Sequence, residues 1–133
     1  MTLRPIEESP ESFLERFSQH LEEVFLFPEP WGSPLLEVKT PAGVVYAFDR
    51  GTPPAPSGPV MALLHGVAEA VRPWEGEAFL RREGPRYCLG GRATPLGEGF
   101  YLLEAGIQVV VYWGGPMPQR AEARLAPPLM LFR

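Results

Sequence analysis

The stretch from Phe100 to Trp113, FYLLEAGIQVVVYW, decides the fold that the sequence predicts. Ala105-Gly106 divides it into two arms rich in β-branched and aromatic residues, and glycine accepts the positive φ that a tight turn requires. Three successive valines between aromatic residues favour a strand over a buried helix. We therefore predict a central hairpin. Its second arm, Ile107 to Trp113, is apolar on both faces and needs cover on both sides, from helices or from a partner subunit.

Two helices are predicted around this hairpin. Ser9-Pro10 is typical of a helix cap followed by the first helical position, and apolar residues recur at helical spacing from there to Phe25. The segment from Pro59 to Val71 has a comparable apolar stripe and predicts the second helix. Val60 to Leu64 also fits a strand, but the helix is the interpretation that we adopt for the whole segment.

The remaining elements are predicted from turn residues and β-rich runs. A second hairpin brackets Pro41-Ala42-Gly43, and Pro73 to Pro85 fits either a helical turn or an irregular strand. Gly114 to Pro128 is expected to be a loop with a helical turn at Gln119 to Arg124. The strands predicted in these parts are Leu35 to Thr40, Val44 to Arg50, Arg86 to Arg92 and Leu129 to Phe132. The fold class is α+β: one domain over residues 1–133, with a mainly antiparallel sheet of five or six strands packed against two helices.

Length and composition indicate a folded protein of a reducing compartment. The 133 residues suffice for one core, and 45% of them are apolar, which excludes a disordered chain. No apolar run reaches the ~18 residues of a membrane helix, and the acidic start lacks the apolar segment of a signal peptide. The single cysteine cannot form an internal disulfide. We predict a cytosolic protein. The many prolines and the lack of asparagine predict a thermophilic source, unless they reflect the codons of a GC-rich genome.

The charge distribution restricts the partners that we expect. The net charge is −4, with ten acidic and four basic side chains in residues 1–71 but six acidic and eight basic ones in residues 72–133. A general nucleic-acid binder would be basic, so nucleic-acid binding is the weakest functional hypothesis. The doubly apolar central strand and the many edge strands predict a homodimer instead.

No catalytic or metal-binding motif is present in the sequence. His20, His65 and Cys88 are too few and too widely separated for a zinc or iron site, and no phosphate-binding glycine loop occurs, so we predict no cofactor. The residues able to perform acid–base or nucleophilic chemistry are His65, Cys88 and Asp49. An enzyme hypothesis, a hydrolase or transferase, therefore uses His65 as the general base with Cys88 or Asp49 as its partner. The alternative roles are structural: a buried thiol for Cys88 and a ligand of turn amides for Asp49.

Arginines alternate with aromatic residues in the second half of the chain. Guanidinium groups bind phosphates and carboxylates in a forked geometry, and aromatic rings stack on flat groups. The same arginines also fit a solvated face that pairs with neighbouring glutamates. The principal hypothesis is a non-catalytic binding or interaction module, one version of which binds a small anionic ligand, and the enzyme is its alternative. The predicted ligand-binding residues are Arg81, Arg82, Arg86, Tyr87 and Trp113.

Overall fold

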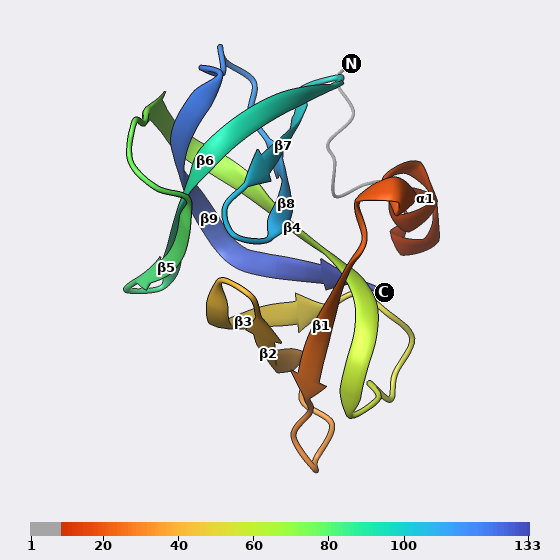
Figure 1. The fold of residues 1–133 in the computed structure, drawn as a ribbon. Coiled ribbons are helices and arrows are strands. Elements are labelled where there is room, and N and C mark those ends of the chain that lie inside the picture. Colours follow the sequence, from red (N-terminus) through yellow and green to blue (C-terminus); the bar gives the residue numbers. More distant parts are fainter. Residues whose placement is uncertain (1–8) are drawn as a thin grey trace.

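A computed structural model describes residues 9–133 as nine strands, one short α-helix and one 3-10 turn (Figure 1). The helix α1 is Pro10–Arg16, and the turn η2 is Ser18–His20. The strands are β1 (Glu22–Phe27), β2 (Leu35–Thr40), β3 (Gly43–Asp49), β4 (Gly58–Pro73), β5 (Phe79–Glu83), β6 (Arg86–Gly97), β7 (Phe100–Glu104), β8 (Gln108–Tyr112) and β9 (Arg120–Phe132).

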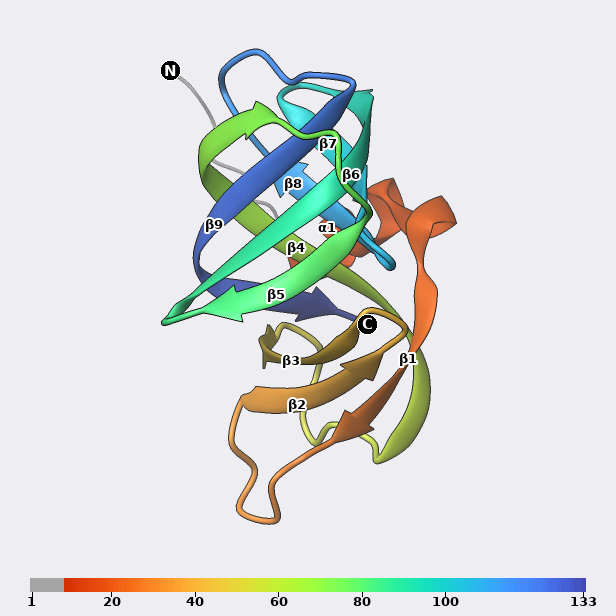
Figure 2. The same cartoon turned by 60° about the vertical axis from the view of Figure 1, so that its left-hand side comes forward.

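All nine strands belong to one mixed sheet that closes on itself twice. The strand order is β1-β2-β3-β9-β4-β8-β7-β6-β5, and β1 also pairs with β4 while β6 also pairs with β9. Strands β1, β2 and β3 therefore close with β9 and β4 into a first barrel, and β6, β7 and β8 close with the same two strands into a second barrel (Figure 2). Strand β5 lies outside both closures as an edge strand paired with β6.

The two barrels have the same topology with β4 and β9 exchanged. In the first barrel, an antiparallel meander β1-β2-β3 pairs parallel with β9 through β3 and antiparallel with β4 through β1. In the second, the antiparallel meander β6-β7-β8 pairs parallel with β4 through β8 and antiparallel with β9 through β6. The chain thus contains a topological repeat that no sequence repeat signals. Because the long strands are shared, neither barrel closes without both of them.

A continuous apolar core runs through the interiors of both barrels. Leu26 lies in the first barrel, Leu89 and Val109 lie in the second, and Leu64 and Leu131 contribute from the shared strands. These side chains are almost completely buried. Alternation along each strand places them inside the barrels and their sequence neighbours outside.

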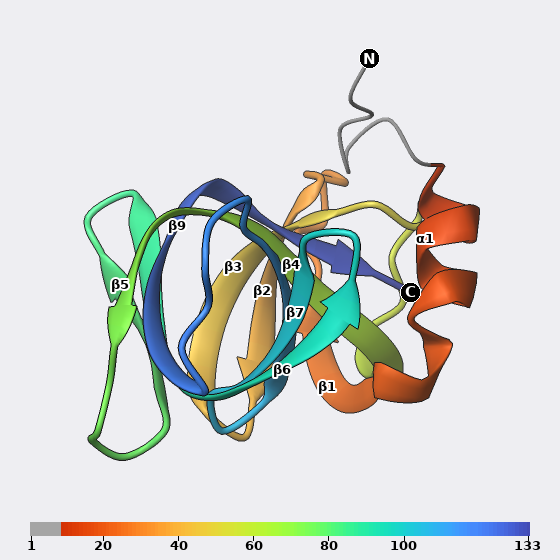
Figure 3. The same ribbon diagram turned by 90° about the horizontal axis from the view of Figure 1, so that it is seen from above.

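A second apolar cluster lies outside the second barrel, under α1 (Figure 3). Phe13 of the helix and Phe17, which directly follows it, pack on Phe100 of β7 and Phe132 of β9. The Phe13 ring lies 4.4 Å from that of Phe132 and 4.9 Å from that of Phe17, measured between centroids. This cluster covers the outer side of the second barrel.

The predicted α+β class was wrong, because the segment from Pro59 to Val71 is not a helix but most of strand β4. Two register shifts in its pairing with β9, between His65 and Val67 and between Ala68 and Ala70, interrupt the alternation that identifies a strand. Its central residues are also buried on both faces where the barrels meet. The apolar pattern that results resembles a helical stripe. The predicted five or six mainly antiparallel strands are nine strands in mixed directions.

The ends of the chain differ from prediction for a similar reason. The Ser9 cap is confirmed by the hydrogen bond from the Ser12 N–H to Ser9 Oγ (3.1 Å), but the helix ends at Arg16 and the apolar residues up to Phe25 continue into β1. The loop and helical turn expected before Leu129 are largely strand, since β9 begins at Arg120.

Both predicted hairpins are confirmed, as β2-β3 and β7-β8, and the second turns at Gly106 with a φ of 89°.

Candidate anion-binding site

His65 is a neutral residue of the outer apolar cluster rather than an accessible base. Its ring centroid lies 4.6 Å from that of Phe13, and the residue is 1% exposed. The Nδ1–H group donates to the Val110 carbonyl at 2.7 Å, and Nε2 is buried without a hydrogen-bond partner among residues 9–133. Burial lowers the pKa of this imidazole to about 4, and the nearby Arg50 contributes in the same direction.

Asp49 holds the end of the first barrel together. Its Oδ1 accepts hydrogen bonds from Arg133 Nε and from the Gly51 N–H, both at 2.9 Å, while Oδ2 accepts from Arg133 Nη2 at 2.8 Å. The hydrogen bond from the Gly51 N–H shows Asp49 in the structural role that the sequence suggested for it, which is to bind a backbone amide of a turn. Both charged side chains are largely buried, so this forked pair is a structural clamp between the end of β3 and the C-terminal residue.

Cys88 lies in β6 in surroundings that keep it a thiol. It is 5% exposed. Burial raises the pKa of Cys88 to about 11, and the negative charges of Glu122 and Glu83 add to the rise. A nucleophilic cysteine needs the opposite shift. No hydrogen bond joins any two of His65, Cys88 and Asp49 in the described part of the chain, and each has a separate set of neighbours.

The predicted arginine site is distributed over several places. Alternation along the β5-β6 pair puts Arg81 beside Cys88 on one face and Arg82 beside Tyr87 on the other. Arg86 forms an ion pair with Glu69. The five predicted ligand-binding residues therefore do not line one common pocket.

Tyr87 and Trp113 have structural contacts of their own. The Tyr87 hydroxyl accepts a hydrogen bond from the Tyr46 backbone N–H at 2.8 Å, which links the second barrel to the first. Trp113 donates from Nε1 to the Pro116 carbonyl at 3.1 Å and packs at the edge of the main core. Tyr87 thus connects the barrels, and Trp113 fixes the loop after β8.

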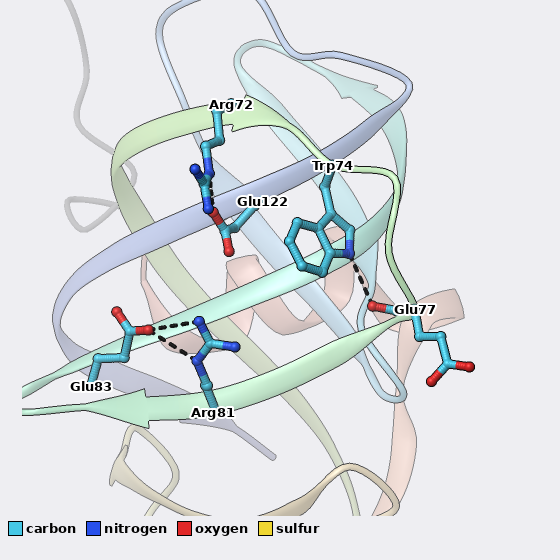
Figure 4. Close-up of polar contacts among 6 residues, drawn as sticks. All are labelled: Arg72, Trp74, Glu77, Arg81, Glu83 and Glu122. Carbon is cyan, nitrogen blue, oxygen red and sulfur yellow. Dashed lines mark hydrogen bonds and ion pairs between the residues drawn. The ribbon is translucent and has the colours of Figure 1, made fainter.

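Arg81 lines a hollow of about 300 Å³ on the outer side of the second barrel, which we call the arginine hollow (Figure 4). Four neighbouring strands, β4, β9, β6 and β5, build it. Arg72 of β4 lies opposite Glu122 of β9. Cys88 of β6 lies between Arg124 of β9 and Arg81 of β5 and is opposite to both. Residues opposite one another in antiparallel strands share a face. The charged residues of the arginine hollow are Arg72, Arg81, Glu83, Glu122 and Arg124.

Two of the three arginines in this hollow have carboxylate partners. Arg81 pairs with Glu83 (Nη2 to Oε2, 2.8 Å), and Arg72 Nε donates to Glu122, as Figure 4 shows. The Glu122 side chain is 8% exposed, and the hydrogen bond from Arg72 lowers the pKa of its carboxyl despite that burial. The Arg124 side chain forms no ion pair or hydrogen bond with any of residues 9–133. Three arginines against two glutamates leave one positive charge uncompensated.

Two aromatic side chains near the start of β5 support Arg81 without lining the hollow. Trp74 donates from Nε1 to the Glu77 carbonyl at 3.0 Å (Figure 4). Its ring meets the Phe79 ring edge-on, with the two centroids 5.1 Å apart. The Arg81 guanidinium lies 4.6 Å from the Phe79 centroid. These contacts hold Arg81 in place by a cation–π interaction in addition to its ion pair.

Arg72 and Arg124 are the residues of this hollow that the sequence interpretation missed. The order Arg120-Ala121-Glu122-Ala123-Arg124 alternates charged and small residues, which is typical of a strand with one polar face. Interpreted as a strand, this segment would have placed Glu122 and Arg124 side by side on one surface. Arg72 gave no comparable signal, since its place depends on the pairing of β4 with β9.

The described residues contain no group of three or more His, Cys, Asp or Glu side chains that fits a metal ion. None of their helices has the length and apolar character needed to cross a membrane. Comparison with known proteins identifies no relative: no protein-family model, no curated protein and no solved structure matches this chain.

Proposed function

We propose that this protein is a non-catalytic binding module for a small anion, which binds in the arginine hollow. The observation that carries the proposal is the uncompensated charge of Arg124 on a wall that Arg72 and Arg81 share. An anion there neutralises that charge without breaking either ion pair.

The two paired arginines retain donors for a ligand. Arg72 contacts Glu122 through Nε, and Arg81 contacts Glu83 through Nε and Nη2. A guanidinium group has five N–H donors, so each arginine keeps further N–H groups for an anion. The neighbouring carboxylates repel a large or highly charged ligand, which favours a compact anion. Because the arginines are largely exposed, binding should weaken as salt concentration rises.

Isothermal titration with inorganic phosphate and with sulfate at low salt tests this proposal. Arg124→Ala should weaken anion binding at least ~10-fold, since a hydrogen bond to a charged group contributes roughly 1.5–3 kcal/mol. Arg86→Ala is the matched control, because Arg86 pairs with Glu69 and does not line the hollow. Equal affinities for Arg124→Ala and the unmodified protein, or no binding of either anion at about 10 mM, would reject the site.

We further propose that the module is a homodimer that associates through the outer face of the first barrel. This apolar outer face consists of large side chains on β1 to β4, each between 39% and 54% exposed. The helix α1 packs on the second barrel instead, while the Arg82 guanidinium of β5 lies 5.9 Å from the Tyr46 ring centroid at the edge of this face. Its members are Phe25, Phe27, Leu35, Val44, Tyr46, Phe48 and Met61.

The extent and charge of this face favour a second copy of the chain as its occupant. Taking about 200 Å² for a large side chain, the exposed parts amount to roughly 600 Å² per chain, near the lower limit of stable interfaces when doubled. Glu37 and Lys39 lie along its middle strand β2, opposite Tyr46 and Val44, and form no ion pair among residues 9–133. A two-fold axis that sets two β2 strands antiparallel and face to face puts Glu37 opposite Lys39 of the other copy.

Light scattering after size exclusion tests the dimer and its arrangement. The protein should be a dimer at about 50 µM, Lys39→Glu should dissociate it by placing like charges in contact, and Glu37→Lys combined with Lys39→Glu should restore it. A monomer at that concentration would reject the dimer. A dimer that survives Lys39→Glu would reject this arrangement.

We propose a cytosolic location for the module. Cys88 is a buried free thiol, and thiols of this kind are typical of proteins from reducing compartments. A fractionation of the source cells with an antibody against the protein would test the location.

A further inference from the structure

We propose a second ligand site, at one end of the second barrel, for an anion that carries a flat apolar body. The site is a hollow of about 570 Å³ between the middle of β6, the start of β7 and the segment that leads into β9. We call it the barrel-end hollow. It shares no residue with the arginine hollow and is nearly twice as large.

Two arginines stand side by side on the rim of the barrel-end hollow. Arg92 of β6 lies directly opposite Arg120 of β9 in an antiparallel pair, and both line the hollow. Like charges in directly opposed positions destabilise a sheet. Arg120 Nη2 donates to the Gly76 carbonyl at 2.6 Å. Because a carbonyl oxygen is neutral, this bond does not compensate the charge of Arg120. The Arg92 side chain forms no ion pair or hydrogen bond with any of residues 9–133.

No carboxylate neutralises this pair within the hollow. The lining residues include no Asp or Glu, in contrast to the arginine hollow with its two glutamates. Glu104 of β7 lies opposite Arg92 on its other side, but the two form no ion pair and Glu104 does not line the hollow. An anion placed between Arg92 and Arg120 converts their repulsion into two charge-assisted hydrogen-bonding partners.

The floor of the barrel-end hollow is apolar and is supported by the main core. Ala93, Tyr101 and Met117 line the hollow and also pack against the buried cluster that fills the barrels. The Ala93 N–H donates to the Gln119 carbonyl at 2.8 Å, which holds the segment before β9 against β6. An aromatic ring and a thioether suit a flat apolar group, and Thr94 on the wall offers a hydroxyl.

These features define the ligand by its chemistry: a phosphate or carboxylate attached to a flat apolar body. The anion lies between the two guanidinium groups, and the apolar body lies over Tyr101 and Met117. Ends of β-barrels are frequent ligand sites because they combine an apolar interior with polar residues at the rim. The inference does not depend on the proposed function, since it rests on a different pair of arginines.

Titration calorimetry with three probes tests this site: phenyl phosphate, benzoate and inorganic phosphate. Phenyl phosphate should bind at least ~10-fold more tightly than inorganic phosphate, because only the former has an apolar body. Arg92→Ala and Arg120→Ala should each weaken phenyl phosphate binding at least ~10-fold. Comparison with benzoate distinguishes a phosphate from a carboxylate as the preferred anion.

The variants also provide their own folding control. Arg92→Ala removes one member of a like-charged pair and no side-chain hydrogen bond, so its melting temperature should stay level or rise slightly, and its loss of binding then reports on the site. Arg120→Ala also loses the hydrogen bond to the Gly76 carbonyl, so Arg92→Ala is the folding control for both variants. Arg86→Ala changes a residue that lines neither hollow and should leave phenyl phosphate binding unchanged. Repeating the titrations in an Arg124→Ala background, where the arginine hollow is weakened, separates this site from that one. Equal binding of phenyl phosphate and inorganic phosphate, unaltered binding to Arg92→Ala and Arg120→Ala, or no binding at about 10 mM would overturn the proposal.

Discussion

The outer apolar faces of the two barrels differ in what covers them. On the second barrel, α1 lies along the outside (Figure 3). Phe13 of α1 and Phe17, which follows the helix, pack there on side chains from the strands, and the residues of this cluster are buried. On the first barrel, Phe25, Tyr46 and Phe48 occupy outward positions and remain about 40% exposed. The topology of the two barrels is the same, so the difference arises from α1, the one α-helix among residues 9–133.

The strand that the sequence predicts to need a partner and the surface that lacks cover are therefore in different barrels. The strand is β8 of the second barrel, and the uncovered surface is the outer face of the first. The sequence indicated that the strand ending at Trp113 required cover on both sides. The structure provides that cover within the chain, since Val109 and Val111 face the main core and Val110 faces the cluster under α1. The homodimer proposal therefore rests on the bare face of the first barrel and no longer on the central strand.

Removing one ring from the covered face should have the largest effect. Phe13→Ala should lower the free energy of unfolding by about 3–5 kcal/mol, because Phe13 is almost fully buried among aromatic rings. Phe27→Ala on the bare face is the matched control and should change it by less than about 0.5 kcal/mol. Urea denaturation at a concentration where the chain is monomeric measures both variants. Similar losses for the two variants would show that α1 and the bare face do not differ in this way.

Local signals in the sequence predicted the hairpins but not the barrels. The turns at Gly106 and between β2 and β3 depend on a few adjacent residues, so their chemistry is visible in the sequence. Closure depends instead on β4 pairing with β8 and on β9 pairing with β3, β4 and β6, all of which join distant segments. A long bulged strand shared by two barrels has no simple period, and β4 was therefore mistaken for a helix.

The residues of the two proposed ligand sites were equally hard to predict from local sequence signals. Arg81 was a candidate because it lies in a short segment where arginines and aromatic residues alternate. Its partners in the hollow, Arg72 and Arg124, come from strands that only the fold brings together. Arg92 and Arg120 likewise become neighbours through the β6-β9 register. Residue type predicted an anion site, but which arginines are free of carboxylates depends on the pairing of distant strands.

The burial of His65 under Phe13 of α1 should have a smaller effect, on how the free energy of unfolding depends on pH. Below pH 6.5 the histidine of the unfolded chain takes up a proton, whereas the folded His65, with a pKa of about 4, does not. The unfolded state therefore binds more protons between pH 6.5 and 4, and the free energy of unfolding falls as pH falls through that window, by about 3 kcal/mol from this residue. His65→Phe keeps a ring under Phe13 but lacks the titration, so its stability should decline less on acidification. Since the carboxyl groups titrate in both proteins, the difference between their unfolding free energies at pH 7 and pH 4 isolates the histidine. Parallel pH profiles would mean that the helix does not keep this side chain dry and that the two outer faces are more alike than their exposures indicate.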